Sequence, residues 1–432
     1  MDRHRSSALA RWWGRSLACL LAIAALAVTL AACGKTSSNS SPTSPAATTT
    51  ATTSAAATTT AAASTGTSGC GTAPSLPFHD PSGVISSLGS TYETAYSGNP
   101  DPIYASAYAN FKPKKSSGFT IGMAFSQAVN SFQADTIPLL QKDLAAIKGV
   151  SHVTLLSAPI TGLTTQIQQV NQLIQQHVDV IVAEPLVPQP FIPLAAKAEK
   201  AGIPFISVIN GMPTPDALSI GPNATADGAN IAAGVAKLIN GTGTVLGVHG
   251  IPSTGVDHAE FTGYSASFAK CPGVKFDTSL VGQFVVPVAK QQVLTYLSNH
   301  PQPVAGAVQP AGMTSGIIQA FDQVGRPQPA HGIGEPVAGE LAYWNEHMST
   351  FKAVAAVIGP QDVARAVSFA VAQLLTAHGP KVSEIVQPSV LVTSANLSQF
   401  LVPGAGTSSQ ATVEGPPNSW MTDSFMAPLF NK

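Results

Sequence analysis

Residues 178–209, which read VDVIVAEPLVPQPFIPLAAKAEKAGIPFISVI, decide the fold. The runs at 178–184 and 202–209 are short and almost entirely apolar, whereas 191–201 has the pattern of an amphipathic helix. Near-continuous apolar strands separated by a helix are typical of a parallel sheet that is covered on both faces. This stretch therefore predicts two neighbouring strands of one parallel sheet and the helix that connects them.

The same alternation continues on both sides of that stretch and forms two series, one beginning at residue 119 and one at residue 223. Outside 178–209, the expected strands are 119–125, 152–158, 243–250, 274–284, 304–310 and 330–335, and the expected helices are 135–147, 165–176, 223–238, 258–270, 288–297 and 314–324. The predicted fold class is therefore α/β, with two doubly wound parallel-sheet lobes. Ligands of such sheets bind beyond the carboxyl ends of the strands, so we expect a site in the cleft between the lobes.

The N-terminus has the features of an export signal. Four arginines between positions 3 and 15 precede an apolar stretch at 17–30, and the tetrapeptide LAAC ends at Cys33. The apolar stretch is shorter than the roughly 20 residues that span a bilayer, which argues against the alternative of a retained membrane anchor. LAAC resembles the lipobox of bacterial lipoproteins. It predicts a signal peptide at 1–32, lipidation of Cys33, and a lipid-anchored location on the extracytoplasmic side of the membrane.

Two further segments separate the signal from the α/β body. Residues 33–75 consist largely of Ser, Thr, Ala, Pro and Gly, so we expect a disordered tether that holds the body away from the membrane or is a passive spacer. Residues 76–117 have aromatic side chains at helical spacing on both sides of the sequence NPDP at 99–102. This pattern predicts an N-terminal extension of two short helices whose aromatic rings pack on the body.

Four cysteines are present, at positions 19, 33, 70 and 271. Cys19 lies within the signal and Cys33 is the expected lipid anchor, so Cys70 and Cys271 remain in an oxidising compartment. They either form a disulfide or stay as two unpaired thiols. Since the sequence cannot show whether their Cα atoms lie within about 7 Å, the unpaired thiols are slightly favoured.

Composition and motifs argue against nucleic acid binding and against catalysis. The chain has 21 basic and 22 acidic residues, so no strong field attracts nucleic acid. It contains no G-x-S-x-G, H-E-x-x-H, C-x-x-C or P-loop pattern, and we expect no enzyme activity, no metal and no cofactor. Ser267 and Lys270 fit the S-x-x-K pattern of a hydrolase, but no S-D-N or K-T-G sequence accompanies them, which favours chance.

The ordered motifs resemble the type I periplasmic binding proteins, particularly the ribose-binding-like, sugar-associated class of ABC importers. The resemblance extends from residue 119 to about residue 400. It is carried by 178–211, by SIGPNATADGANIAAGVAKLI at 219–239, by FTGYSASFAKCPGVKF at 261–276 and by LSNHPQPVAGAVQPAGMTSGIIQAF at 297–321. The lac repressor family shares this fold but begins with a DNA-binding helix-turn-helix, where this chain has an export signal.

This resemblance implies a substrate-binding lipoprotein, expected to be a monomer, that captures a small polar ligand and delivers it to an ABC permease. The alternative is a sensor whose closed form signals to a membrane receptor. The family's three crossings between lobes imply hinges near 221–225, 359–361 and 390–394. The implied lobes are 118–222 with 361–392, and 223–360 with the C-terminal segment 393–432.

The resemblance and the predicted strand ends together give ten candidate ligand contacts: Gln127, Asn130, Phe132, Glu184, Asn210, His258, Phe284, Gln309, Glu335 and Gln361. Asn130 matches a polar contact of the family, and Phe132 and Phe284 match its stacking aromatics. Simpler roles stay open for some of them. Asn130 could cap the following helix, the two phenylalanines could belong to the core, and Asn210 before Gly211 also fits turn chemistry.

Other positions depart from the family pattern. His258 and Asn210 stand where arginines are frequent, Pro310 and Ala311 replace an Asn-Asp pair, and Gly334 replaces an Asp. Arginine's planar fork has no substitute in histidine, so the cleft is less suited to a fully hydroxylated monosaccharide. A sugar remains the leading expectation, and a modified sugar, a polyol or a nucleoside-like molecule is the alternative.

Overall fold

The computed structural model describes residues 69–388, 390–417 and 419–432. The predicted signal peptide at 1–32, the lipidation of Cys33 and most of the tether at 33–75 lie outside these ranges. Within them, no helix combines the length and the apolar character that crossing a bilayer requires.

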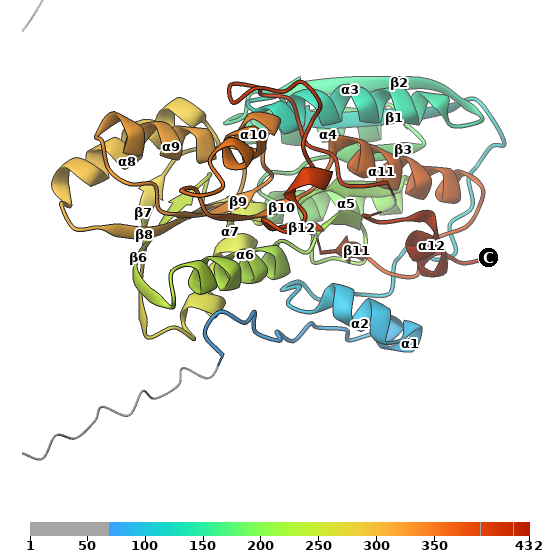
Figure 1. Ribbon diagram of the computed structural model, residues 1–432. Helices are drawn as coiled ribbons and strands as arrows, with labels where there is room; N and C mark the ends of the chain where they lie inside the picture. Colours follow the sequence, from blue (N-terminus) through green and yellow to red (C-terminus); the bar gives the residue numbers. More distant parts are fainter. Residues whose placement is uncertain (1–68, 389, 418) are drawn as a thin grey trace, which may run out of the picture. The chain divides into compact units, whose positions relative to one another are not determined.

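The first lobe contains a six-stranded sheet of order β11-β5-β4-β3-β1-β2, in which every pairing is parallel (Figure 1). Its strands are β1 Phe119–Ser126, β2 Val150–Ala158, β3 Val180–Ala183, β4 Phe205–Val208, β5 Leu218–Pro222 and β11 Glu384–Gln387. Val180 and Val182 of β3 join one core cluster, and Ile181 and Ala183 join another. Both faces of the sheet are therefore buried at β3, which explains why this strand is apolar at every position.

Helices cover both faces of this sheet. The helices of the first lobe are α3 Ser131–Ala146, α4 Leu163–Gln175, α5 Ile192–Lys200 and α11 Pro360–Leu375, with a 3-10 turn at Gln189–Phe191 before α5. α3 and α11 pack against each other and contribute to one core cluster, whereas α4 and α5 contribute to the other. The elements predicted from residue 119 to residue 209 are therefore all present.

The second lobe has a sheet of order β12-β10-β9-β8-β6-β7, which is parallel except for the antiparallel pair of β10 and β12. Its strands are β6 Thr242–His249, β7 Gly273–Val281, β8 Val304–Gln309, β9 Ala330–Gly334, β10 Ala353–Val357 and β12 Val390–Val392. Its helices are α6 Ala224–Leu238, α7 Gly255–Phe268, α8 Val286–Asn299, α9 Thr314–Gln323 and α10 Ala338–Glu346. α6 and α7 pack on one face, and α8 and α9 pack on the other.

The chain passes between the two sheets at three places. It leaves the first lobe between β5 and α6 at Asn223, returns between β10 and α11, and leaves again between β11 and β12. These places coincide with or adjoin the expected hinges. One expectation needs correction, because β12 at 390–392 pairs with β10 and so belongs to the second sheet, not to the first lobe.

The N-terminal extension packs on the first lobe, but only its first part is helical. α1 Val84–Leu88 and α2 Ser90–Tyr96 are present, and Tyr92 and Tyr96 join the core cluster of the first lobe. The second expected helix, around Tyr104 and Tyr108, is absent. There the backbone forms hydrogen bonds with a distant segment instead of within a helix. Ser106 N–H donates to Lys381 O, and Ser383 N–H donates to Tyr104 O. The aromatic rings pack on the body as predicted.

The last residues of the chain belong to the first lobe, which corrects the expected assignment for the final part of 393–432, whereas Leu397 and Phe400 lie in the second-lobe core as expected. Val413 still lies in a core cluster of the second lobe, but Trp420 and Phe430 are buried in that of the first. Arg365 of α11 donates to the carbonyl oxygens of Trp420 at 2.7 Å and Met421 at 2.6 Å. These hydrogen bonds hold the C-terminal segment against α11.

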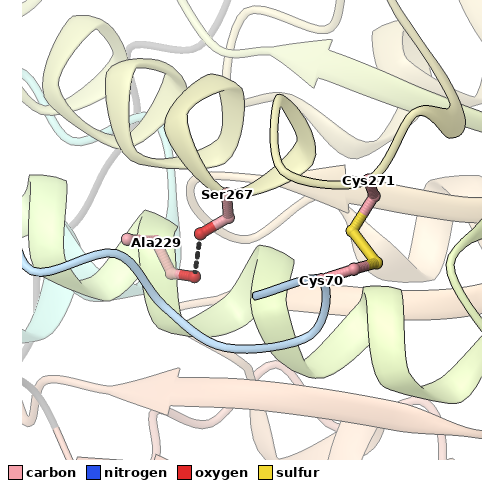
Figure 2. Close-up of a disulfide and its surroundings, with 4 residues drawn as sticks. All are labelled: Cys70, Ala229, Ser267 and Cys271. Carbon is pink, nitrogen blue, oxygen red and sulfur yellow. Dashed lines mark hydrogen bonds between the residues drawn. A yellow bond between two sulfur atoms is a disulfide. The ribbon is translucent and has the colours of Figure 1, made fainter. Parts of the chain in front are cut away.

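Cys70 and Cys271 form a disulfide with a Cα–Cα distance of 4.8 Å, so the structure has the pairing that the sequence slightly disfavoured (Figure 2). Cys271 follows α7 of the second lobe. Cys70 lies in the segment that the sequence assigned to the disordered tether, and the disulfide instead bonds the end of this segment to the second lobe. The N-terminal extension that follows is packed on the first lobe through α2.

Candidate ligand-binding cleft

A cavity of about 430 Å³ lies between the lobes at the carboxyl ends of their strands. The first lobe contributes the segment between β1 and α3, and the second lobe contributes the segments that follow β7, β8 and β9. A narrower inner part reaches Glu184, Asn210 and Thr254. The cavity is thus built from both lobes, and much of its wall is apolar.

Asn130 combines the two roles that the sequence left open. Its side-chain oxygen accepts a hydrogen bond from Gln133 N–H at 2.9 Å and caps α3. The same side chain lines the cavity. Capping fixes the oxygen, so the amide nitrogen is the group left to face a ligand.

Phe132 and Phe284 both line the cavity, one from each lobe. The ring of Phe284 occupies space that only a glycine leaves free, because a Cβ on Gly250 would lie 2.1 Å from its Cζ. Phe132 packs at the edge of the first-lobe core but remains partly exposed. Two aromatic faces are therefore available to a ligand between the lobes.

The backbone around the cavity is strained. Ile209, Gln283, Phe284 and Glu335 have φ values of 68°, 58°, 58° and 44°, which are unusual for residues other than glycine. They follow strands β4, β7 and β9, where these strands open onto the cavity. Such strain costs on the order of 1–3 kcal/mol per residue and tends to occur at ligand clamps.

One carboxylate reaches the cavity from each lobe: Glu184 follows β3 and Glu335 follows β9. Glu184 is only 7% exposed and accepts hydrogen bonds from Gln133 Nε2 at 3.3 and 3.4 Å. Burial raises the pKa of Glu184 to about 7, although the Gln133 bonds oppose this rise. Burial, followed by the charges of Glu184 and Asp227, raises the pKa of Glu335 to about 8.

Asn210 joins the two lobes directly. Its side-chain oxygen accepts a hydrogen bond from Val256 N–H of α7 at 3.1 Å, and Gly255 N–H donates to Leu186 O at 3.3 Å beside it. Asn210 lines the inner part of the cavity, but its acceptor is already used between the lobes.

Four predicted contacts do not line this cavity. Gln127 is exposed beyond β1, and Gln361 is exposed at the start of α11. Gln309 is fully buried beneath the cavity, where its Nε2 donates to Thr314 Oγ1 at 2.9 Å and to Gly334 O at 3.1 Å. His258 lines a separate hollow of about 320 Å³. These positions follow strands or begin helices as expected, but their side chains turn away from the cavity.

Several lining residues were missed. Gln133 donates from its Nε2 to Ser126 Oγ and to the Glu184 carboxylate. It lies three residues after the helix cap Asn130, and this spacing could have indicated that it is near the site. Gln410 and Thr412 line the cavity from the C-terminal segment. Thr412 Oγ1 bonds Asp135 Oδ2 of α3 at 2.7 Å. That segment has no periodic pattern, so nothing in the sequence predicted its position.

The hydrolase alternative lacks a site. Ser267 is buried between α6 and α7 and donates to Ala229 O at 2.7 Å (Figure 2). Lys270 is exposed after α7, and neither residue lines the cavity. Ser267 therefore fastens two helices together.

A two-lobed α/β body with a ligand-sized cavity at the facing strand ends defines the class of solute-binding proteins. The periplasmic binding protein domain family matches residues 121–379, more than half of the chain, and the chain belongs to this family. The family consists of extracytoplasmic substrate-binding proteins and not of enzymes.

The xylitol-binding protein of Mycolicibacterium smegmatis (strain ATCC 700084 / mc(2)155) is 27% identical over 179 residues, which are 41% of this chain and 50% of that protein. The chain thus aligns with only half of that relative's length.

Two solved structures show the same fold. An ABC transporter solute-binding protein from Mycobacterium smegmatis with bound glycerol has a TM-score of 0.59 at 18% identity, covering 69% of this chain and all of the other. One from Bacillus halodurans C-125 with bound myo-inositol has a TM-score of 0.58 at 19% identity, covering 66% of this chain and 98% of the other.

Proposed function

We propose that this chain is the substrate-binding lipoprotein of an ABC importer. A lipid on Cys33 holds it outside the cytoplasmic membrane, and it captures a sugar-like or polyol ligand for delivery to a permease. The observation that carries the proposal is the cavity of about 430 Å³ with walls from both lobes, in a chain that belongs to a family of substrate-binding proteins.

Capture follows from the position of the cavity at the hinged junction. A ligand that touches Phe132 of the first lobe and Phe284 of the second contacts both only when the lobes are closed. It therefore binds the closed form more tightly and shifts the population towards it. The permease then recognises the closed form.

A polyol is the ligand class that we favour. The cavity has aromatic faces and amides, whereas no arginine lines it among the described residues. The names of the three relatives described above mention the polyols xylitol, glycerol and myo-inositol, whereas other solved structures of this fold contain sugars such as D-allose and alpha-D-tagatopyranose. The preference for a polyol therefore rests on the lining of the cavity. The amide of Asn130 supplies a donor for hydroxyl groups.

Binding can be tested by isothermal titration calorimetry of the full chain in detergent with xylitol, myo-inositol, glycerol and ribose. We expect one of these ligands to bind at a single site. At 100 times its dissociation constant it should stabilise the protein by about 2.7 kcal/mol. Binding that persists unchanged in a Phe132→Ala, Phe284→Ala variant would contradict the proposed site.

The lipid anchor needs its own experiment. The Cys33→Ser variant should no longer incorporate labelled fatty acid and should move from the membrane fraction to the aqueous fraction. Cys70→Ser is the matched control, because it removes a cysteine that is paired in the body and should leave acylation intact.

A further inference from the structure

The charged side chains that line the cavity are all acidic. Glu184 and Glu335 are the charged side chains among its described lining residues, and no lysine, arginine or histidine lies beside them. They approach from opposite lobes, so closure brings two carboxylates towards each other in a partly desolvated space. The charge of Asp227 of α6, after burial and the charge of Glu184, contributes to the raised pKa of Glu335.

Neither carboxylate has a cationic partner in the described part of the chain. No ion pair there includes Glu184 or Glu335. Within the described residues, the only side chain that donates to the carboxylate of Glu184 is the neutral amide of Gln133, and no hydrogen bond to the carboxylate of Glu335 is present. The backbone N–H of Glu335 donates to Ala356 O at 3.0 Å, which fixes the position of the Glu335 backbone at the cavity.

Unpaired carboxylates in such a space are costly unless a proton or a cation neutralises them. A divalent metal ion prefers six or more oxygen ligands, and no group of three acidic, histidine or cysteine side chains is placed for one in the described residues. An organic cation needs fewer contacts. Its apolar carbons also suit the wall formed by Phe132, Phe284 and the half-exposed Val129.

We propose that the ligand carries a protonated amine, which lies between Glu184 and Glu335 while its hydroxylated part fills the rest of the cavity. This inference rests on the proposed function and narrows its ligand from polyols and sugars in general to amino-polyols and amino sugars. The amine bridges both lobes, so each ion pair is complete only in the closed form. The two carboxylates thereby determine ligand specificity and help to stabilise the closed form.

The proposed ion pairs predict that ligand binding releases protons and that affinity depends on pH. Without ligand, the raised pKa values of about 7 and about 8 leave both carboxyls largely protonated below neutral pH. Binding an ammonium group requires their ionised forms, so binding releases protons and affinity rises from pH 6 to pH 8. A neutral polyol gains nothing from ionisation, and its affinity stays flat or falls over the same range.

The experiment uses matched ligands on the full chain in detergent: sorbitol against 1-amino-1-deoxysorbitol, whose primary amine stays protonated at pH 8. Titration calorimetry in two buffers of different ionisation enthalpy measures both affinity and protons released. We expect an amine to bind at least tenfold more tightly than its neutral partner at pH 8, with proton release. Glu335→Gln should abolish the preference, and Glu346→Gln, at an exposed position of α10, should leave it unchanged.

The outcomes separate this inference from the proposed function. If neutral ligands bind as tightly as their amines, or if neutral ligands alone bind, the amine inference is wrong and the polyol-binding function stands. If putrescine, which has amines but no hydroxyl group, binds and no hydroxylated compound of either kind does, the cation site stands and the polyol and sugar class is wrong. If none of the amines binds, the inference is overturned.

Discussion

The two lobes share one architecture but differ in how the chain assembles them. The second lobe is almost continuous in sequence, from α6 to β10, with only β12 and the following segment added later. The first lobe collects β1 to β5, then α11 and β11, then both ends of the described chain. The first lobe therefore depends on distant segments for part of its core, whereas the second is nearly complete by residue 357.

The largest effect should come from removing the C-terminal contribution to the first lobe. Trp420 is 1% exposed, and truncation to alanine leaves a cavity, so Trp420→Ala should lower the free energy of unfolding by about 3–5 kcal/mol. Urea denaturation measures this. Trp420→Phe should cost less, since it keeps a ring and removes an indole N–H that has no partner among the described residues. A loss below about 1 kcal/mol for the alanine variant would show that the first lobe is stable without this segment.

The next effect concerns the disulfide that bonds the segment before the N-terminal extension to the second lobe. Replacing Cys70 and Cys271 together by serine should cost about 2–4 kcal/mol, because the disulfide closes a long loop with a sequence separation of 201. A thermal melt with and without reductant provides the control. Reductant should lower the midpoint of the wild-type protein and leave the double variant unchanged, and equal melts for both proteins would contradict the role of the bond.

The carboxylates of the two lobes should differ in their pH dependence. The folded-state pKa of Glu335 is raised from 4.5 to about 8, so its stabilising contribution is complete below pH 4.5 and is lost as the pH rises to about 8. Glu335→Gln should therefore raise stability at pH 8 relative to pH 5 by on the order of 2 kcal/mol. Glu184→Gln should act in the same direction but over the narrower range up to about pH 7.

Urea unfolding at both pH values tests this difference, with Glu346→Gln as the control that should follow the wild type. A variant at Glu335 that keeps the full wild-type pH dependence would show that this carboxylate is already ionised in the folded state. In that case burial and the charge of Glu184 would disfavour the ionised form of Glu335 less strongly than its position indicates.

The smallest effect should come from the contact that joins the lobes at Asn210. Asn210→Ala removes the acceptor for Val256 N–H, a hydrogen bond worth about 0.5–1.5 kcal/mol, and should shift the free protein towards an open form. Spin-label distances between the lobes measure the shift. Asn210→Asp retains an acceptor oxygen and should stay closer to the wild type. Identical distances in the wild-type and alanine proteins would show that other contacts hold the lobes.

The regular part of the fold could be predicted because its strands are buried on both faces. VDVIVAE and GIPFISVI are apolar at nearly every position, and such runs stand out in the sequence. The short strands β5, β11 and β12 and the C-terminal segment could not be predicted. Their positions depend on pairing with distant strands or on packing against α11, and neither leaves a local period.

The site was predictable only in part for a similar reason. Predicted strand ends indicated Glu184 and Asn210, and the family resemblance indicated four more residues. All six line the cavity or its inner part; the four are Asn130, Phe132, Phe284 and Glu335. The direction of a side chain beyond a strand end depends on loop conformation. Glu335 turns into the cavity with φ at 44°, whereas Gln309 turns down to bond Thr314. Neither conformation can be read from the identity of the residue.

The disulfide also limits how far the lobes can separate. Leu76 O accepts hydrogen bonds from Gly98 N–H at 3.1 Å and Ser97 Oγ at 2.9 Å, which fastens this residue to the end of α2 on the first lobe. Six residues lead from Cys70 to Leu76, and an extended chain of that length reaches about 20 Å. Residues 70–76 therefore set an upper limit on the distance between the lobes. Reduction of the disulfide would remove this limit.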